Sequence, residues 1–159
     1  MGWDVFEVAA AETYPLRAEL LRSDRTDLDL HLPEDDVPGA FHLAVTDDSG
    51  AIIGVASATP AAPMFTAPMP AWRLRQMAVA TAMQGCGVGT AIFGALLERL
   101  RSRHAATLWA ESRDRSLGFY MARGMHPVPG RHHVVSGVDY TDVVLDLRGE
   151  RVPEPTARA

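Results

Sequence analysis

A glycine-rich turn, Gln84-Gly85-Cys86-Gly87-Val88-Gly89, combines residue types and spacing that could bind a phosphate. It follows the apolar segment 72–79 and precedes a long amphipathic stretch. Glycines allow the backbone to turn tightly, with its N–H groups pointing at a ligand. The N-terminus of a following helix adds a partial positive charge that favours a phosphate group. The turn therefore predicts a site for a ligand that carries a diphosphate.

The spacing of the glycines narrows the choice of diphosphate ligand. Gly85, Gly87 and Gly89 give G-x-G-x-G, whereas dinucleotide-binding folds use G-x-G-x-x-G with an acid about 20 residues later. Residues 105 and 106, near that later position, are both alanine. A Walker-type loop needs a lysine, and the chain contains none. The turn thus differs from both of these nucleotide fingerprints.

Two motifs in the chain resemble those of the GNAT acetyltransferase superfamily. Gln84, Gly87 and Gly89 match the acyl-CoA loop Q/R-x-x-G-x-G/A. A helix over 87–103, a strand over 106–110 and a short helix that carries Phe119-Tyr120 and ends at Gly124 then follow in the superfamily's order. The resemblance covers residues 73–128. It implies an α/β fold with a mixed, mostly antiparallel central sheet of about seven strands and helices on both faces.

The resemblance implies that the chain transfers an acetyl or other short acyl group from acetyl-CoA to a primary amine by direct attack in a ternary complex. The backbone of Met77 and Val79 is expected to pair with the pantetheine arm as a neighbouring strand would. Backbone N–H groups of the turn are expected to hold the pyrophosphate, and they belong to Gln84, Gly85, Gly87, Gly89 and Thr90. The resemblance also suggests a homodimer through the last strands.

Two side chains are candidates for proton transfer. Tyr120 falls where the superfamily often places a tyrosine that meets the CoA sulfur, and a phenol can protonate a departing thiolate. Packing of Tyr120 under the sheet is an equally open interpretation. Glu111, at the end of the fifth strand, is the best carboxylate candidate for a general base, because the resemblance implies that the fourth and fifth strands open there toward the acceptor. The amide of Gln76 on the fourth strand cannot take up a proton. Water relayed through backbone groups is an alternative to any side-chain base.

Other reactive residue types do not form a recognisable site in the sequence. His132 and His133 are adjacent, so on a strand they point to opposite faces, and no carboxylate or cysteine cluster accompanies them. We therefore expect no metal. Cys86 would lie at a helix N-terminus, where thiol pKa values fall. A bound pyrophosphate would cover it, and no separate Cys-His-Asn arrangement supports a nucleophilic role.

The remaining pattern supplies the elements that position these residues. We expect a strand within 1–8, a helix from residue 13 or 14 with Pro15 in its first turn, and a hairpin formed by 41–46 and 51–59. Closely spaced prolines in 60–70 predict a loop. The later strands are 72–79, 107–110, 125–128 and 142–147, and Ser112 is the expected N-cap of the short helix. Loops 24–39, 60–72 and 129–140 are expected to line the acceptor site.

Composition limits the functional classes. The chain has 159 residues and a net charge of −5, which argues against nucleic acid as a partner. No run of 18 apolar residues is present, so no membrane span is expected. A single cysteine and an N-terminus unlike a signal peptide favour the cytoplasm. We predict one acyltransferase domain over residues 1–147 and a disordered tail over 148–159.

Two other functions remain compatible with the glycine turn. The chain could sense acyl-CoA without turning it over, since no base is evident, and amine-dependent release of CoA would exclude this. It could instead be a nucleotide enzyme with a similar loop, in which case ATP or NAD, and not acetyl-CoA, would raise its melting temperature. The acceptor is also open among a polyamine, an amino acid, an aminoglycoside-like compound and a protein amine.

Overall fold

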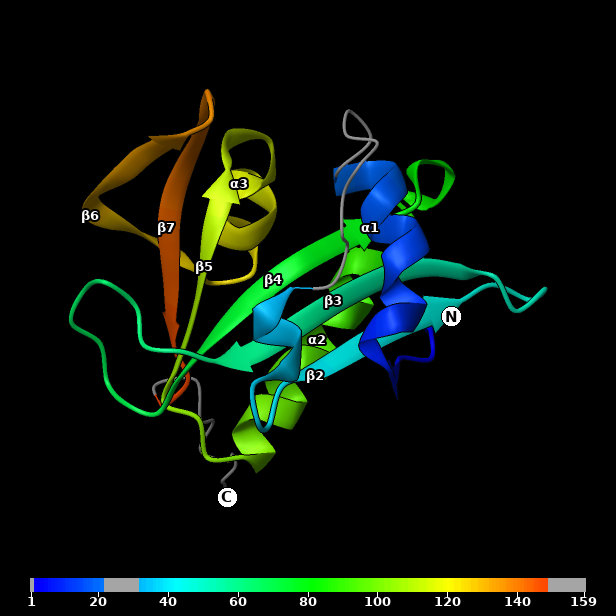
Figure 1. Ribbon diagram of the computed structural model, residues 1–159, viewed down its shortest axis with the longest axis horizontal. Helices are drawn as coiled ribbons and strands as arrows, with labels where there is room; N and C mark the ends of the chain where they lie inside the picture. The colour runs from blue at the N-terminus through cyan, green and yellow to red at the C-terminus, as the bar shows by residue number, and fades with distance from the viewer. Residues whose placement is uncertain (1, 22–31, 149–159) are drawn as a thin grey trace, which may run out of the picture. The chain divides into compact units, whose positions relative to one another are not determined.

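The computed structural model describes residues 2–21 and 32–148, which form two compact units (Figure 1). The first unit contains the described residues up to Pro60 together with residues 74–102. The second contains residues 61–73 and the described residues from Arg103 onward. Each unit is described by itself. The predicted tail beyond residue 148 and residues 24–31 of the predicted acceptor loop lie outside the described residues, and one domain over 1–147 stays a prediction.

Seven strands form one sheet in the order β1-β2-β3-β4-β5-β7-β6. The pairs β1–β2, β2–β3, β5–β7 and β6–β7 are antiparallel, and β4–β5 is parallel. The expected α/β fold with a mixed, mostly antiparallel sheet is therefore confirmed. The strands are β1 (Phe6–Val8), β2 (Phe41–Thr46), β3 (Ile52–Pro60), β4 (Ala71–Val79), β5 (Thr107–Arg113), β6 (His126–Val135) and β7 (Val138–Asp146).

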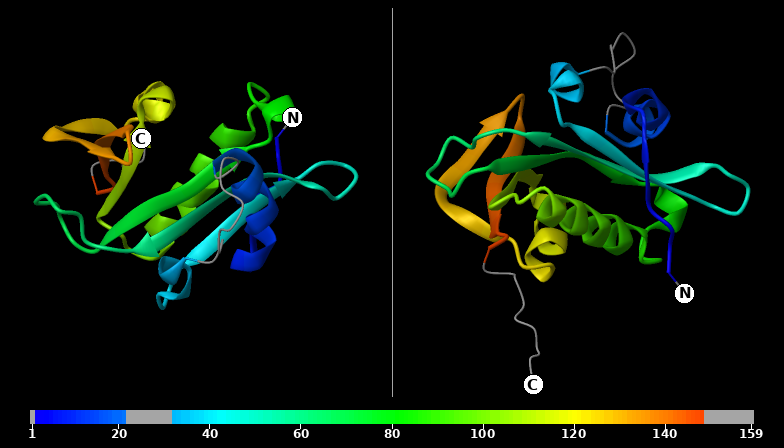
Figure 2. Two further views of the ribbon diagram at one scale, coloured as in Figure 1. Left: turned by 45° about the horizontal axis from the view of Figure 1, so that its top comes forward. Right: turned by 90° about the horizontal axis from the view of Figure 1, so that it is seen from below.

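In the first unit, two helices cover opposite faces of β2 and β3 (Figure 2). These are α1 (Tyr14–Leu21), with Pro15 in its first turn as expected, and α2 (Val88–Ser102). The predicted apolar stripe of α2 is confirmed, because Val88, Ile92, Leu96 and Leu100 are all buried. Three short 3-10 turns complete the unit, namely η1 (Ala10–Thr13), η2 (Pro33–Asp36) and η3 (Thr81–Met83).

Gly54 on β3 allows the start of α2 to approach the sheet closely. A Cβ atom at this position would lie 2.7 Å from Cγ1 of Val88 and 2.8 Å from Cδ1 of Ile92. Such distances are shorter than a side chain could occupy without displacing its neighbours. The missing side chain of Gly54 thus lets the first turns of α2 pack directly on β3, and this contact positions the end of the helix that adjoins the glycine turn.

The second unit places α3 (Asp114–Ala122) beside β5 and β7 (Figure 1). The prediction that Ser112 caps this helix is wrong. Ser112 is the sixth residue of β5, and its hydroxyl donates to the carbonyl of Arg113, which is the N-cap residue and makes no side-chain cap. The predicted end of the helix at Gly124 is confirmed. Gly124 has a φ of 96°, and the next N–H, that of Met125, donates to the Tyr120 carbonyl at 3.1 Å.

The prediction that residues 129–140 form a loop is also wrong. β6 and β7 pair almost to their shared turn, with Val135 opposite Val138, and Ser136 and Gly137 make the turn at positive φ. Pro127 and Pro129 both lie in β6. β6 is the last strand of the sheet, and an edge strand tolerates proline because one side of its backbone needs no partner.

The proline-containing segment 61–70 has no regular structure, as predicted, but the second unit anchors it. The indole N–H of Trp109 donates to the Ala61 carbonyl at 2.8 Å, and the Thr107 hydroxyl donates to the Pro68 carbonyl at 2.7 Å. Phe65 contacts the Trp109 ring edge-on, with 6.2 Å between the ring centroids. Over the described residues, no helix combines the length and the apolar character needed to cross a membrane.

Candidate functional site

The predicted phosphate-binding turn joins η3 to α2 in the first unit. Gly85 and Gly87 have φ angles of 81° and 89°, a backbone conformation that side chains disfavour. The sequence therefore needs glycine at both positions to reverse the chain before Val88 begins the helix. Around a Cβ built at Gly85, no described atom lies within 4 Å, so this part of the turn is open.

The backbone N–H groups of the turn are arranged as a helix N-terminus requires. The Ala91 N–H donates to the Gly87 carbonyl at 3.0 Å, which is the i−4 pattern of a helix. The N–H groups of Gly87 and Gly89 precede that bond at the N-terminus of α2. The N–H of Gln84, by contrast, donates to the Thr81 carbonyl at 3.3 Å. The role of all these groups in pyrophosphate binding stays a prediction.

Two side chains hold the turn in place. The indole N–H of Trp3 donates to the Cys86 carbonyl at 3.0 Å, and the side-chain amide of Gln84 donates to the Val79 carbonyl at 3.1 Å. The carbonyl of Val79 is therefore engaged within the protein, and the pairing of Met77 and Val79 with a pantetheine arm stays a prediction. Sequence reasoning missed Trp3, because no local pattern links it to a residue 83 positions away.

Gln76 lies within β4, just before the two residues predicted to meet the pantetheine arm. Its φ is 54°, which is unusual for a residue with a side chain, and its Oε1 is buried without a hydrogen-bond partner among the described residues. A residue held in this conformation costs about 1–3 kcal/mol and is often found at functional sites. Met77 and Val79 follow this irregularity and are half-buried. Sequence reasoning found no sign of it, because glutamine gives no turn signal.

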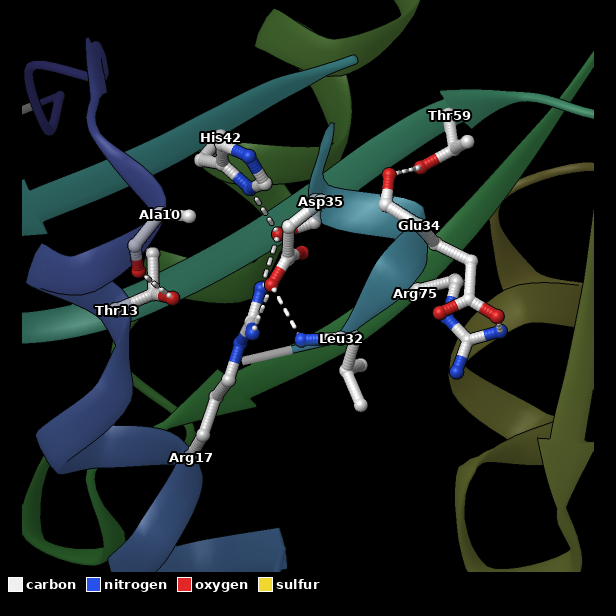
Figure 3. Close-up of polar contacts among 10 residues, drawn as sticks. Ala10, Thr13, Arg17, Leu32, Glu34, Asp35, His42, Thr59 and Arg75 are labelled. Atoms are coloured by element: carbon white, nitrogen blue, oxygen red, sulfur yellow. Dashed lines mark hydrogen bonds and ion pairs between the residues drawn. The ribbon is translucent and has the colours of Figure 1, made fainter. Parts of the chain in front are cut away.

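In the first unit, a buried polar network attaches the described end of the predicted acceptor loop to the sheet (Figure 3). Arg17 on α1 donates to both oxygens of Asp35 in η2, at 2.9 and 3.0 Å, and to the Ser57 hydroxyl on β3 at 3.0 Å. His42 Nδ1 lies 2.6 Å from that hydroxyl. Glu34 of η2 also pairs with Arg75 of β4 at 3.5 Å. These contacts fix η2, which belongs to the predicted loop 24–39.

In the second unit, Glu111 forms an ion pair. Its Oε1 accepts a 2.8 Å hydrogen bond from Arg73 Nη2, and the Arg73 guanidinium lies over the Trp109 ring at 5.0 Å from its centroid. The side chain of Glu111 is 31% exposed, so solvent can reach it. The predicted general base is therefore a carboxylate that Arg73 orients, and its catalytic role stays a prediction.

The structure brings two further residues to Glu111, and this corrects the reading of His133 as unaccompanied by carboxylates. His133 on β6 lies with Nε2 3.8 Å from Glu111 Oε2 and with Nδ1 3.9 Å from Asp142 Oδ1. Asp142 on β7 is buried, and its Oδ2 accepts a 2.8 Å hydrogen bond from Arg131 Nε. Sequence reasoning missed this cluster because it treated 129–140 as a loop, so no register between β6 and β7 was available.

Glu111, His133 and Asp142 each offer one atom of a kind that binds metals, and these atoms lie within 4.8 Å of one another. A divalent cation would, however, share this cluster with the guanidinium groups of Arg73 and Arg131, each of which binds one of the carboxylates. Like charges at such short range repel. The two guanidinium groups therefore weaken the attraction of this cluster for a cation, and the expectation of no metal stays a prediction.

Tyr120, the predicted proton donor, lies on α3 in the second unit and is 8% exposed. Its ring contacts Phe119 edge-on, with 5.4 Å between the centroids. Burial raises the pKa of Tyr120 to about 12, because the charged phenolate is poorly solvated in the protein interior. The phenol therefore keeps its proton at neutral pH. Its contact with a CoA sulfur stays a prediction.

Comparisons with known proteins agree with the fold. The uncharacterized N-acetyltransferase YitI of Bacillus subtilis is 26% identical over 121 residues, which cover 76% of this chain and 80% of that protein. An aminoglycoside 6'-N-acetyltransferase solved with coenzyme A has a TM-score of 0.72 at 13% identity, over 96% of this chain and 99% of that one. An acyl-CoA N-acyltransferase from Pseudomonas aeruginosa has a TM-score of 0.70 at 13% identity, over 90% and 99% of the two chains.

The family comparison covers most of the chain. The family model described as "Acetyltransferase (GNAT) family" matches residues 4–125. That match includes residues 84–90, Glu111 and Tyr120. The chain belongs to the acetyltransferase (GNAT) family.

Proposed function

We propose that the protein transfers an acetyl or other short acyl group from acyl-CoA to a primary amine. Membership of the family supports acyl transfer in general. The observation that carries the use of CoA is the turn before α2, in which Gly85 and Gly87 adopt positive φ directly before the N-terminus of the helix at Val88. Such a turn suits the pyrophosphate of CoA, and it lacks the lysine that a Walker loop would use.

The proposed reaction requires two proton transfers. The amine nitrogen attacks the thioester carbonyl, a C–N bond forms, and the C–S bond breaks. Glu111 would take a proton from the amine nitrogen, and Tyr120 would give one to the departing thiolate. The structural neighbour that is an aminoglycoside 6'-N-acetyltransferase supports the proposal of an amine acceptor for this chain. A cytoplasmic location and a homodimer stay predictions.

An assay of CoA thiol release tests this proposal. The purified protein would be incubated with acetyl-CoA and, separately, with polyamines, amino acids, aminoglycosides and a lysine-containing peptide. We expect at least one amine to raise thiol release above the rate without amine, and mass spectrometry to detect that amine with one acetyl group added. Tight binding of acetyl-CoA with no amine-dependent release would contradict the proposal and favour an acyl-CoA sensor.

A further inference from the structure

Two carboxylates lie directly opposite each other on neighbouring strands of the second unit. Glu111 on β5 and Asp142 on β7 are cross-strand partners, and like charges in such positions repel. One arginine offsets each charge: Arg73 donates to Oε1 of Glu111, and Arg131 donates to Oδ2 of Asp142, both at 2.8 Å. The second oxygen of each carboxylate lies near the ring of His133.

His133 presents a different ring nitrogen to each carboxylate. Nε2 is 3.8 Å from Glu111 Oε2, and Nδ1 is 3.9 Å from Asp142 Oδ1. Asp142 is 1% exposed, and its Oδ1 has no hydrogen-bond partner among the described residues. A buried oxygen without a partner is costly, and an N–H at Nδ1 of His133 is the donor beside it. Both distances exceed a hydrogen bond, and a shift of about 1 Å would close each gap.

We propose that Glu111, His133 and Asp142 form a proton relay, in which His133 receives the proton that Glu111 takes from the amine and Asp142 holds His133 in one tautomer. The inference rests on the proposed function, in which Glu111 is the base. With Asp142 as acceptor, the hydrogen stays on Nδ1, and the lone pair of Nε2 is directed at Glu111. Glu111 would touch the substrate, whereas His133 and Asp142 are positioning residues.

The proton balance of the relay is simple. As the C–N bond forms, the amine nitrogen gives a proton to Glu111, which passes it to Nε2 of His133 and becomes a carboxylate again. The negative charge of Asp142 stabilises the imidazolium. Because the His133 side chain is 29% exposed, the imidazolium can release a proton to water and regenerate the starting tautomer. The relay involves no oxidation or reduction, and it needs no co-reactant.

The other groups around His133 are compatible with this role. The Tyr140 ring stacks on the imidazole, with 5.8 Å between centroids and 19° between planes, which holds the ring while leaving both nitrogens at its edge. The charged groups that face the cluster are Arg73 and Arg131, already described. On the same hairpin, His132 Nε2 lies 3.3 Å from Asp139 Oδ1, with side chains that are 58% and 50% exposed. This neighbouring His-Asp pair provides a matched control.

The tautomer of His133 tests the relay independently of activity. In the wild-type protein, nitrogen NMR of the histidine rings should show His133 with its hydrogen on Nδ1, its signals being identified by their loss in His133→Ala. In Asp142→Asn, Arg131 should retain the carbonyl oxygen of the amide, so the NH2 group would face Nδ1. We therefore expect the hydrogen to move to Nε2. A wild-type ring with its hydrogen on Nε2 would overturn the relay.

Kinetics complete the test. Asp142→Asn and His133→Ala should each lower kcat by about tenfold or more, with the KM for acetyl-CoA unchanged. Added imidazole should restore part of the kcat of His133→Ala, which a purely structural role of this residue would not allow. The control variants His132→Ala and Asp139→Asn should keep wild-type rates. Wild-type rates in Asp142→Asn and His133→Ala would overturn the relay alone, whereas a wild-type protein that acylates no amine would overturn the proposed function as well.

Discussion

The indole N–H of Trp3 donates a 3.0 Å hydrogen bond to the carbonyl oxygen of Cys86, in the middle of the glycine turn. Gly85 and Gly87, on either side of Cys86, both adopt positive φ. The contact therefore ties the N-terminal segment to the part of the backbone that we expect to meet the pyrophosphate.

Removal of this hydrogen bond should weaken CoA binding. Trp3→Phe keeps an aromatic ring but cannot donate to the Cys86 carbonyl, so the turn should be less well ordered before ligand binds. A hydrogen bond contributes about 1 kcal/mol, which corresponds to a roughly fivefold rise in Kd. Calorimetric titration should show this rise for both acetyl-CoA and CoA, because they share the pyrophosphate. An unchanged Kd for both would show that Trp3 does not order the turn.

The close approach of α2 to β3 predicts opposite effects for two glycine substitutions. Gly54→Ala would push a methyl group against Val88 and Ile92 and should lower the free energy of unfolding by about 1–3 kcal/mol. Gly94→Ala, on α2 where a Cβ meets no described atom within 4 Å, should raise it by up to about 1 kcal/mol. Urea unfolding of both variants measures the difference, and equal stabilities would contradict the packing described here.

The buried network around Arg17 predicts acid sensitivity. Burial lowers the pKa of His42, and the Arg17 charge adds to this effect although Asp35 opposes it. For Asp35, burial acts to raise the pKa, but hydrogen bonds from Arg17 and from the Leu32 N–H outweigh it, so the pKa lies below its ordinary value. The folded state therefore binds protons at both groups less readily than the unfolded state.

Stability should fall with pH in two stages. The stability that each group contributes is fully present above its unfolded pKa and is lost as the pH falls toward its folded pKa. The stability that His42 contributes therefore begins to fall at about pH 6.5, and the stability that Asp35 contributes begins to fall at about pH 4. Urea midpoints of the wild-type protein should fall between about pH 7.5 and pH 5. His42→Gln should reduce that fall, and His132→Gln, at an exposed position, should not. Identical pH slopes in the wild-type protein and His42→Gln would exclude the assignment.

Tyr120→Phe should lower kcat by about tenfold, with little change in the KM for acetyl-CoA, if the phenol protonates the thiolate. Because the pKa of Tyr120 is raised to about 12, the phenol keeps its proton up to about pH 10. Any alkaline fall of kcat below that pH should therefore appear in both the wild-type protein and the variant. A kcat of Tyr120→Phe equal to that of the wild-type protein would remove Tyr120 from the mechanism.

The parts of the fold that follow from local pattern were predictable. The helical spacing of Val88, Ile92, Leu96 and Leu100 identified the buried face of α2, and the glycine turn before it could be located from residue types alone. The fold class and the family also followed from the order of two motifs. These features depend on residues close together in the sequence, whose steric preferences fix the backbone locally.

The parts that depend on long-range pairing were not predictable. The Trp3–Cys86 hydrogen bond joins residues 83 positions apart, and Gln76 adopts a positive φ that its residue type does not signal. The Glu111–His133–Asp142 cluster requires the register of β5, β6 and β7, which could not be known while residues 129–140 were taken for a loop. Each of these features is decided by tertiary contacts and not by local preference.

The central claim, that the glycine turn binds acyl-CoA, is tested by thermal unfolding with acetyl-CoA, CoA, ATP and NAD in parallel. Gly87→Asp places a charge in the turn, and Gly50→Asp is its control, since Gly50 lies in the β2–β3 turn with a φ of 88° against 89° at Gly87. A ligand at about 100 times its Kd adds about 2.7 kcal/mol of stability, or several degrees. Of the four compounds, only acetyl-CoA and CoA should raise the melting temperature of the wild-type protein and of Gly50→Asp. Neither should raise the melting temperature of folded Gly87→Asp. No shift of the wild-type protein with either CoA compound, or an equal shift in Gly87→Asp, would contradict the account.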